Sequence, residues 1–111
     1  MKRLTQKILP NCYKKPSGQT FTSVYGRLSP NKANTLTTQF TRYGTGRYGH
    51  YEQDRALSLR EGAILQTFPQ KYDFNVVKLG ITRVSRHIGN ALPPIIGKLI
   101  GNLFIKSLYK K

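Results

Sequence analysis

Acidic residues are scarce in this chain of 111 residues, which has four Asp and Glu against 19 Lys and Arg, a formal net charge of +15. All four acids lie between residues 52 and 73, so both flanks are purely basic. A field of this sign disfavours cationic partners and favours a polyanion, of which nucleic acid is the commonest. A ribosomal-type protein, or a merely soluble basic protein, would have the same charge.

Cysteine is almost absent as well, because Cys12 is the only one. It can form no internal disulfide, and no Cys/His spacing in the chain indicates a zinc site. Met1-Lys2-Arg3 resembles the start of a signal peptide, but Lys7 and Pro10 interrupt the next segment before an apolar core forms. The sequence therefore predicts a reduced, cytoplasmic protein without a metal ion.

The most apolar stretch follows Pro94, which suits the first turn of a helix. Its apolar residues recur on one helical face: Ile96, Leu99, Ile100, Leu103 and Phe104. Three polar residues form an i, i+4 stripe beside them: Lys98, Asn102 and Lys106. This stripe argues against a membrane span, although a basic amphipathic helix on a membrane surface remains an alternative.

The first half of the chain has the composition of short strands and turns. Val24-Tyr25 and residues 35–40 are rich in residues that suit extended structure, and the turn-forming Ser29-Pro30-Asn31 lies between them. We predict that these two segments pair as short antiparallel strands. Residues 1–20 are basic and turn-prone, and we expect an irregular lead-in there.

A helix start is encoded at Ser58-Leu59-Arg60-Glu61, which fits a capping box. The serine hydroxyl and the glutamate carboxylate each satisfy a backbone amide of the other residue. The helix should run for about two turns and end before Pro69, with Leu57, Leu65 and Phe68 in the core. Short strands combined with separate helices predict an α+β fold.

The stretch Gly44-Thr45-Gly46-Arg47-Tyr48-Gly49 matches the dinucleotide-binding pattern G-x-G-x-x-G. That pattern holds a pyrophosphate only where a helix begins within it, and the residues that follow have no helical period. We therefore discount a cofactor loop. Two readings remain for this glycine-rich segment: a mobile loop that lays Arg42, Arg47 and tyrosine rings against nucleic acid, or a plain surface loop.

Two ordered motifs resemble those of a known family. Residues 55–69 (RALSLREGAILQTFP) are similar to the penultimate block of the DNA cytosine-5 methyltransferases, R-x-L-[ST]-x-R-E-x-A-x-L-Q-x-F-P. Residues 86–94 (RHIGNALPP) resemble the family's last block, in which G-N-[AS] and an apolar residue precede a proline and a terminal helix. Residues 24–28 (VYGRL) and the Thr35-Leu36 pair resemble parts of the family's target-recognition domain.

The resemblance implies a domain organisation and a DNA-binding site. Residues 1–20 would be the basic lead-in, 21–54 a partial target-recognition domain, 55–74 the penultimate block, and 75–111 the last block with the closing helix. The recognition domain would approach double-stranded DNA through Thr35, Leu36, Arg42, Tyr43, Arg47 and Tyr48. The threonines could instead serve only as strand formers.

The resemblance also implies a partial cofactor site. Asn90, Ala91 and Leu92 would line part of the pocket for S-adenosyl-L-methionine. The closing helix would dock on a Rossmann-like catalytic domain, or alternatively fill a small core of this chain. Arg55, Ser58, Arg60 and Glu61 would have a structural role, supporting the recognition domain.

The family's catalytic blocks are not found in these residues. There is no F-x-G-x-G cofactor turn, no Pro-Cys-Gln nucleophile, no Glu-Asn-Val and no Gln-x-Arg-x-Arg. Cys12 lies in a different context, and His50 and His87 have no suitable partner, so none is a catalytic candidate. The chain alone should be inert. It fits the small subunit of a split enzyme completed by a catalytic polypeptide, a truncated remnant, or a free DNA-binding module.

Overall fold

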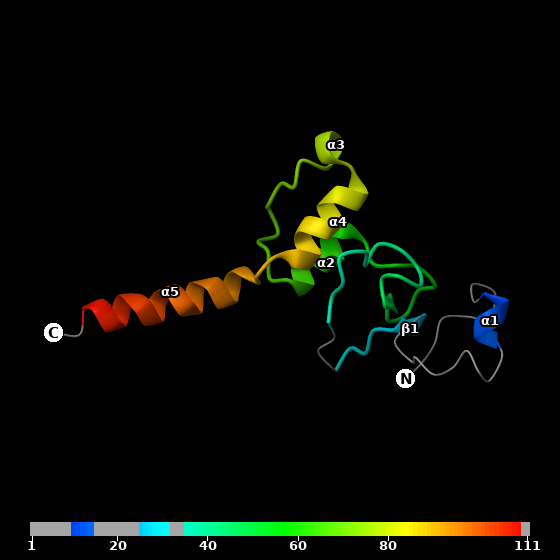
Figure 1. The fold of residues 1–111 in the computed structure, drawn as a ribbon, viewed down its shortest axis with the longest axis horizontal. Helices are drawn as coiled ribbons and strands as arrows, with labels where there is room; N and C mark the ends of the chain where they lie inside the picture. Colours follow the sequence, from blue (N-terminus) through cyan, green and yellow to red (C-terminus); the bar gives the residue numbers. More distant parts are fainter. Residues whose placement is uncertain (1–9, 15–24, 32–34, 110–111) are drawn as a thin grey trace.

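The computed structural model describes residues 10–14, 25–31 and 35–109. Helices α2, α3 and α4 cluster together with the loops between residues 35 and 57, and α5 projects away from them (Figure 1). The elements follow one another as α1 (Asn11–Lys14), β1 (Gly26–Arg27), β2 (Tyr48–Gly49), α2 (Leu59–Leu65), α3 (Val76–Leu79), α4 (Ile81–Asn90) and α5 (Pro94–Leu108). This mixture of helices and short strands is compatible with the expected α+β class.

The strand pairing differs from the sequence prediction. Strand β1 pairs in parallel with β2, and Gly26 lies opposite Tyr48. Val24 lies outside the described residues, and Tyr25 occupies a turn with a φ of 56°. Residues 35–37 have no regular structure and residues 38–40 form a turn, so the predicted antiparallel pair is wrong. Extended propensity does not select a partner, and here the segment 35–40 packs against helices instead.

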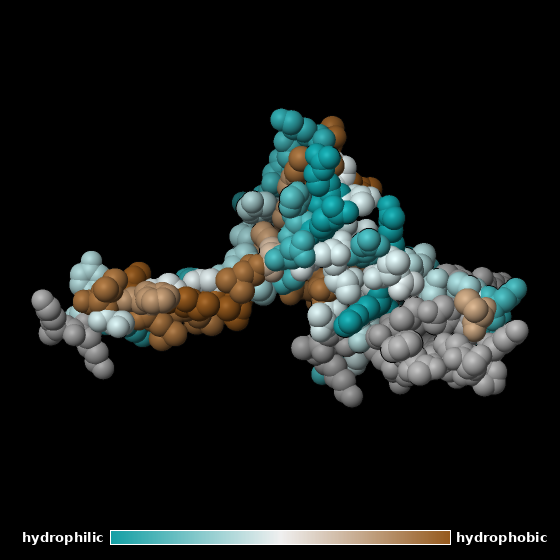
Figure 2. Space-filling view, viewed as in Figure 1, coloured by the Kyte–Doolittle hydropathy of each residue, from teal (hydrophilic) through white to brown (hydrophobic). Residues whose placement is uncertain are grey.

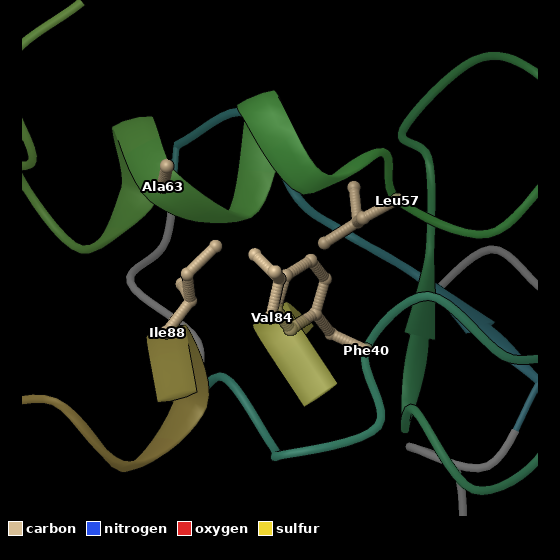
Figure 3. Packing of buried hydrophobic residues seen from close by; sticks show 5 residues of the cluster. All are labelled: Phe40, Leu57, Ala63, Val84 and Ile88. Atoms are coloured by element: carbon tan, nitrogen blue, oxygen red, sulfur yellow. The ribbon is translucent and has the colours of Figure 1, made fainter. Parts of the chain in front are cut away.

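The core is built around one aromatic ring. Phe40 is fully buried, and Figure 3 shows its ring between α2 and α4. A Cβ placed on Gly62 of α2 would lie 2.3 Å from the Phe40 ring, so only glycine allows this approach. The buried apolar residues come from three separate segments of the chain: Phe40, Leu57, Ala63, Val84 and Ile88.

Helix α2 begins with the capping box that the sequence predicted. The backbone amide of Glu61 donates to the Ser58 hydroxyl at 3.2 Å, and the Ser58 amide donates to the Glu61 carboxylate at 2.8 Å. The helix has seven residues and ends before Pro69, as expected. Leu57 is buried and Phe68 half-buried, but Leu65 is 54% exposed, so its assignment to the core is wrong. Ala63 occupies the inward position of α2 instead.

Helix α4 was not anticipated as a helix. It begins after Gly80, whose φ is 78°, and it buries Val84, Ser85 and Ile88. These residues are one, three and four positions apart, which places them on one helical face. The helix packs against both α2 and α3 and ends at Asn90, so Gly89 and Asn90 form its last turn.

Helix α5 begins at Pro94, as predicted, and none of its residues is buried. It packs on no other helix or strand of the described residues, and its apolar side chains form the brown arm in Figure 2. The alternative that this helix fills the chain's own core is therefore wrong for this structure. Its large apolar residues are all at least 40% exposed: Ile95, Ile96, Leu99, Ile100, Leu103, Phe104, Ile105 and Leu108.

By length and composition alone, the stretch Ile81–Leu108 could cross a membrane, which is weak evidence of a span. The backbone interrupts it, because Ala91 has a ψ of 142° and Pro93 a ψ of 126°, both outside the helical range. The 15 residues of α5 alone reach about 22 Å, less than the roughly 30 Å of a bilayer core. The two helices are therefore distinct elements.

Candidate functional site

Residues 35–42, which include the predicted DNA-contacting pair Thr35 and Leu36, run along one face of α4. We name them the recognition segment after that prediction. The Ser85 hydroxyl lies 3.2 Å from the Thr38 carbonyl, and the Arg42 guanidinium donates to the Thr82 hydroxyl at 3.3 Å. At Gly89 an added Cβ would lie 2.7 Å from the carbonyl oxygen of Thr37. These contacts use residues 82, 85 and 89, which share a helical face. Helix α4 therefore holds the recognition segment along most of its length.

A groove of about 640 Å³ opens between the recognition segment and the helices. It brings together three of the predicted DNA-contacting residues, Thr35, Leu36 and Tyr48. Leu65 and Gln66 at the end of α2 line another side, as does Gly89, the neighbour of Asn90. The groove thus joins parts of all three family-like segments, and the exposed Leu65 lies on its wall.

The other predicted DNA-contacting residues lie in the glycine-rich loop. Arg42, Tyr43 and Arg47 are exposed, and they surround a small pocket that Tyr25 and Tyr48 also line. The Tyr43 hydroxyl donates to the Asp54 carbonyl at 2.6 Å. No helix begins in or just after this loop, which agrees with discounting a dinucleotide site.

A cap network of Arg55, Ser58 and Glu61 fixes the start of α2. The Arg55 guanidinium donates to both carboxylate oxygens of Glu61, at 2.8 and 2.6 Å. Hydrogen bonds from Arg55 and from Ser58 lower the pKa of Glu61 to about 2. The bond to Glu61 in turn raises the pKa of Arg55. Two charge-assisted bonds in a fixed plane hold residue 55 against the helix.

Arg60 contacts the segment after α2, and His50 lies beside Glu61. The Arg60 guanidinium lies 5.9 Å from the centre of the Phe74 ring and 3.4 Å from the Tyr72 carbonyl. His50 Nδ1 accepts bonds from the amides of Glu52 and Gln53, while Nε2 lies 3.6 Å from Glu61. Both ring nitrogens of His50 are thus occupied by structural contacts. In the described part of the chain, no three His, Cys, Asp or Glu residues gather as a metal site would require.

Acid should weaken the fold through Glu61. Because its folded pKa is lowered from 4.5 to about 2, its contribution to stability is present above pH 4.5 and is lost between pH 4.5 and 2. Glu61→Gln keeps the capping geometry and removes the charge. The free energy of unfolding of the wild type should exceed that of Glu61→Gln at pH 6, and the difference should shrink toward pH 2. Denaturant titrations at both pH values measure it, and a difference independent of pH would contradict the assignment.

The predicted cofactor residues lie where α4 ends. Asn90 is exposed, Ala91 is half-buried and Leu92 is 62% exposed. Arg83 and Arg86 precede Asn90 by seven and four residues, so all three share one exposed face of α4. The two arginines were missed as candidates because α4 itself was not predicted, although their helical spacing is visible in the sequence.

Comparisons with known proteins agree with the motifs. The family model "C-5 cytosine-specific DNA methylase" matches residues 3–106. The chain is 47% identical to the type II methylase M.HgiDII of Herpetosiphon aurantiacus, over 96% of this chain and 31% of that protein. It is 33% identical to the type II methyltransferase M.AquIB of a Picosynechococcus strain, over 81% of this chain and 68% of that protein.

A plant protein matches over nearly the same span. The chain is 33% identical to DNA (cytosine-5)-methyltransferase 2 of Arabidopsis thaliana, over 97% of this chain and 7% of that protein. The chain therefore spans under a third of the Herpetosiphon protein and a small part of the plant protein. No solved structure matches the chain.

Proposed function

The chain belongs to the C-5 cytosine-specific DNA methylase family, and we propose that it supplies the C-terminal part of a DNA cytosine-5 methyltransferase. Such an enzyme transfers a methyl group from S-adenosylmethionine to C5 of cytosine in DNA. The chain's share is DNA recognition and part of the cofactor pocket. A larger polypeptide that carries the catalytic blocks completes the enzyme, and the chain alone is inactive.

The observation that carries this proposal is the uncovered helix α5. Eight large apolar side chains project from it into solvent, and no other helix or strand of the described residues covers them. A helix that is apolar around most of its circumference is normally enclosed by other parts of a protein. The Herpetosiphon relative has more than two thirds of its length outside the match, so the family has the additional chain that would cover it.

The M.AquIB relative is a short member of the family. Its match of 98 residues amounts to 68% of that protein, which is therefore itself a short polypeptide. A protein named a type II methyltransferase can thus be only moderately longer than this chain. The match to this short relative shows that the family-like segments of this chain can make up most of a polypeptide that bears the methyltransferase name.

On the DNA side, we assign base and sugar contacts to the groove and phosphate contacts to the basic residues around it. Thr35, Leu36 and Tyr48 line one continuous groove, while Arg42 and Arg47 lie exposed on the adjoining loop. Arginine and backbone groups position a protein on the duplex, and side chains that reach base edges specify the sequence. Arg83 and Arg86 of α4 are exposed as well, and Arg42 donates to Thr82, the residue next to Arg83.

On the cofactor side, the residues present fit one edge of a S-adenosylmethionine site. The exposed Asn90 amide is free to donate and accept hydrogen bonds, and the exposed Leu92 offers an apolar surface beside it. The bound cofactor supplies the methyl group. Asn90, Ala91 and Leu92 bind and orient it, and the catalytic groups come from the second polypeptide.

A non-catalytic DNA-binding module is the second candidate, and the net charge of +15 favours it.

A hybrid enzyme distinguishes between the two candidate functions. The segment of M.HgiDII that matches this chain is replaced by the chain itself, at 47% identity. If the proposal is right, the hybrid methylates cytosine in DNA, detected as protection or as labelled 5-methylcytosine. A hybrid that is folded and binds DNA but transfers no methyl group would favour the binding module.

A further inference from the structure

Ser85 is a buried polar residue. It belongs neither to the proposed DNA-contacting surface nor to the proposed cofactor site. Its side chain is 1% exposed and lies among the apolar residues of the core. The hydroxyl is 3.0 Å from the Thr82 carbonyl in its own helix and 3.2 Å from the Thr38 carbonyl in the recognition segment. The single hydroxyl hydrogen is shared between these two carbonyls. The bond to Thr82 is local to the helix, so the contact to Thr38 is the one that tertiary structure adds.

One turn further along the same face of α4, at Gly89, there is no room for a side chain. A Cβ at Gly89 would lie 2.7 Å from both the Thr37 oxygen and the Thr38 Cα, and 2.8 Å from the Thr38 nitrogen. These are backbone atoms, which cannot rotate away as the end of a side chain can. Ser85 and Gly89 therefore both contact Thr38, Ser85 by a hydrogen bond and Gly89 by a close approach that also includes Thr37.

Residues on either side of Thr37 and Thr38 also make contacts that hold the recognition segment in place. Phe40, two residues beyond Thr38, is fully buried between α2 and α4 (Figure 3). Thr35 and Leu36 lie just before Thr37, on the groove wall that Gly89 shares. Asn90 directly follows Gly89. Gly89 thus lies between the residues proposed to contact DNA, with which it shares the groove, and the residues proposed to contact the cofactor, which directly follow it in the chain.

We infer that Ser85 is a positioning residue, whose bond to the Thr38 carbonyl, beside the close approach at Gly89, sets the Thr35-Leu36 pair relative to residues 90–92. This inference rests on the proposed function. Ser85 touches neither DNA nor cofactor. It fixes the distance between the DNA-contacting segment and the methyl donor, so its loss misplaces the target base rather than weakening cofactor binding.

The test compares two serine variants in the M.HgiDII hybrid. Ser85→Ala removes the hydrogen bond, and kcat for methylation should fall about five- to tenfold, while the Kd for S-adenosylmethionine stays within about twofold. Ser58→Ala removes the α2 cap at an exposed site away from Thr38, and it should lower the melting temperature without changing kcat. Gly89→Ala should act in the same direction as Ser85→Ala, because its Cβ must displace the segment.

The outcomes distinguish a failure of the positioning role from a failure of the proposed function. If the wild-type hybrid is active and Ser85→Ala keeps its full kcat, the positioning role is refuted and the proposed function stands. If Ser85→Ala and Ser58→Ala lower kcat equally, Ser85 contributes only to stability and the inference fails. A wild-type hybrid that is folded and binds DNA but transfers no methyl group refutes the proposed function, and this inference falls with it.

Discussion

Replacing Leu99 and Leu103 of α5 by Asp should abolish assembly with the catalytic polypeptide. Both leucines are more than half exposed in this chain and lie on the face that we propose to dock. In the complex the two carboxylates would be buried without partners, which costs at least about 3 kcal/mol, or more than a hundredfold in Kd. Pull-down with M.HgiDII lacking its matching segment measures the loss.

A matched pair of controls isolates the docking face. Asn102→Asp with Lys106→Gln changes the net charge by the same two units on the polar stripe of α5, and it should leave assembly nearly intact. Asn90→Ala should also spare assembly and instead weaken binding of S-adenosylmethionine. The account of α5 is wrong if the double-Asp variant assembles as tightly as the wild type. It is also wrong if the polar-stripe variant loses assembly to the same degree.

The sequence predicted those features that depend on neighbouring residues. The capping box at Ser58 and Glu61, the end of α2 before Pro69 and the start of α5 at Pro94 are set within one or two helical turns. Each follows from side-chain groups that satisfy backbone atoms close by, or from the fixed φ of proline. Such local rules hold whatever the rest of the chain does.

The predictions that were wrong concern features that depend on contacts between residues far apart in the sequence. Residues 35–40 favour extended structure, yet Phe40 is buried beside Gly62 and Thr38 is bound by Ser85, so the segment turns along α4. These partners are 22 and 47 residues away from the segment. The parallel pairing of β1 with β2 likewise joins residues more than 20 positions apart. Propensity alone cannot choose among such partners.

Helix α4 was missed for a different reason. Its buried face includes Ser85, and its last turn contains Gly89 and Asn90, which are common in turns. Val84 and Ile88 have the i, i+4 spacing of a helix, but two apolar residues are too few to establish a helical period. Consequently the grouping of Arg83, Arg86 and Asn90 on one face was missed. The groove that Thr35, Leu36 and Tyr48 share with Gly89 joins distant segments and emerged only from the fold.

Methyl transfer by two separate polypeptides tests the central claim most directly. The purified chain, M.HgiDII lacking its matching segment, and a mixture of the two are each incubated with DNA and radiolabelled S-adenosylmethionine. Because the nucleophile and cofactor-turn motifs of the family are not found in the chain, the chain alone should incorporate no label. M.HgiDII without its matching segment lacks the DNA-recognition and cofactor-edge residues, so it should also be inactive, and only the mixture should place label on cytosine C5. Label incorporated by the chain alone, or none from a mixture that demonstrably assembles, would contradict the account.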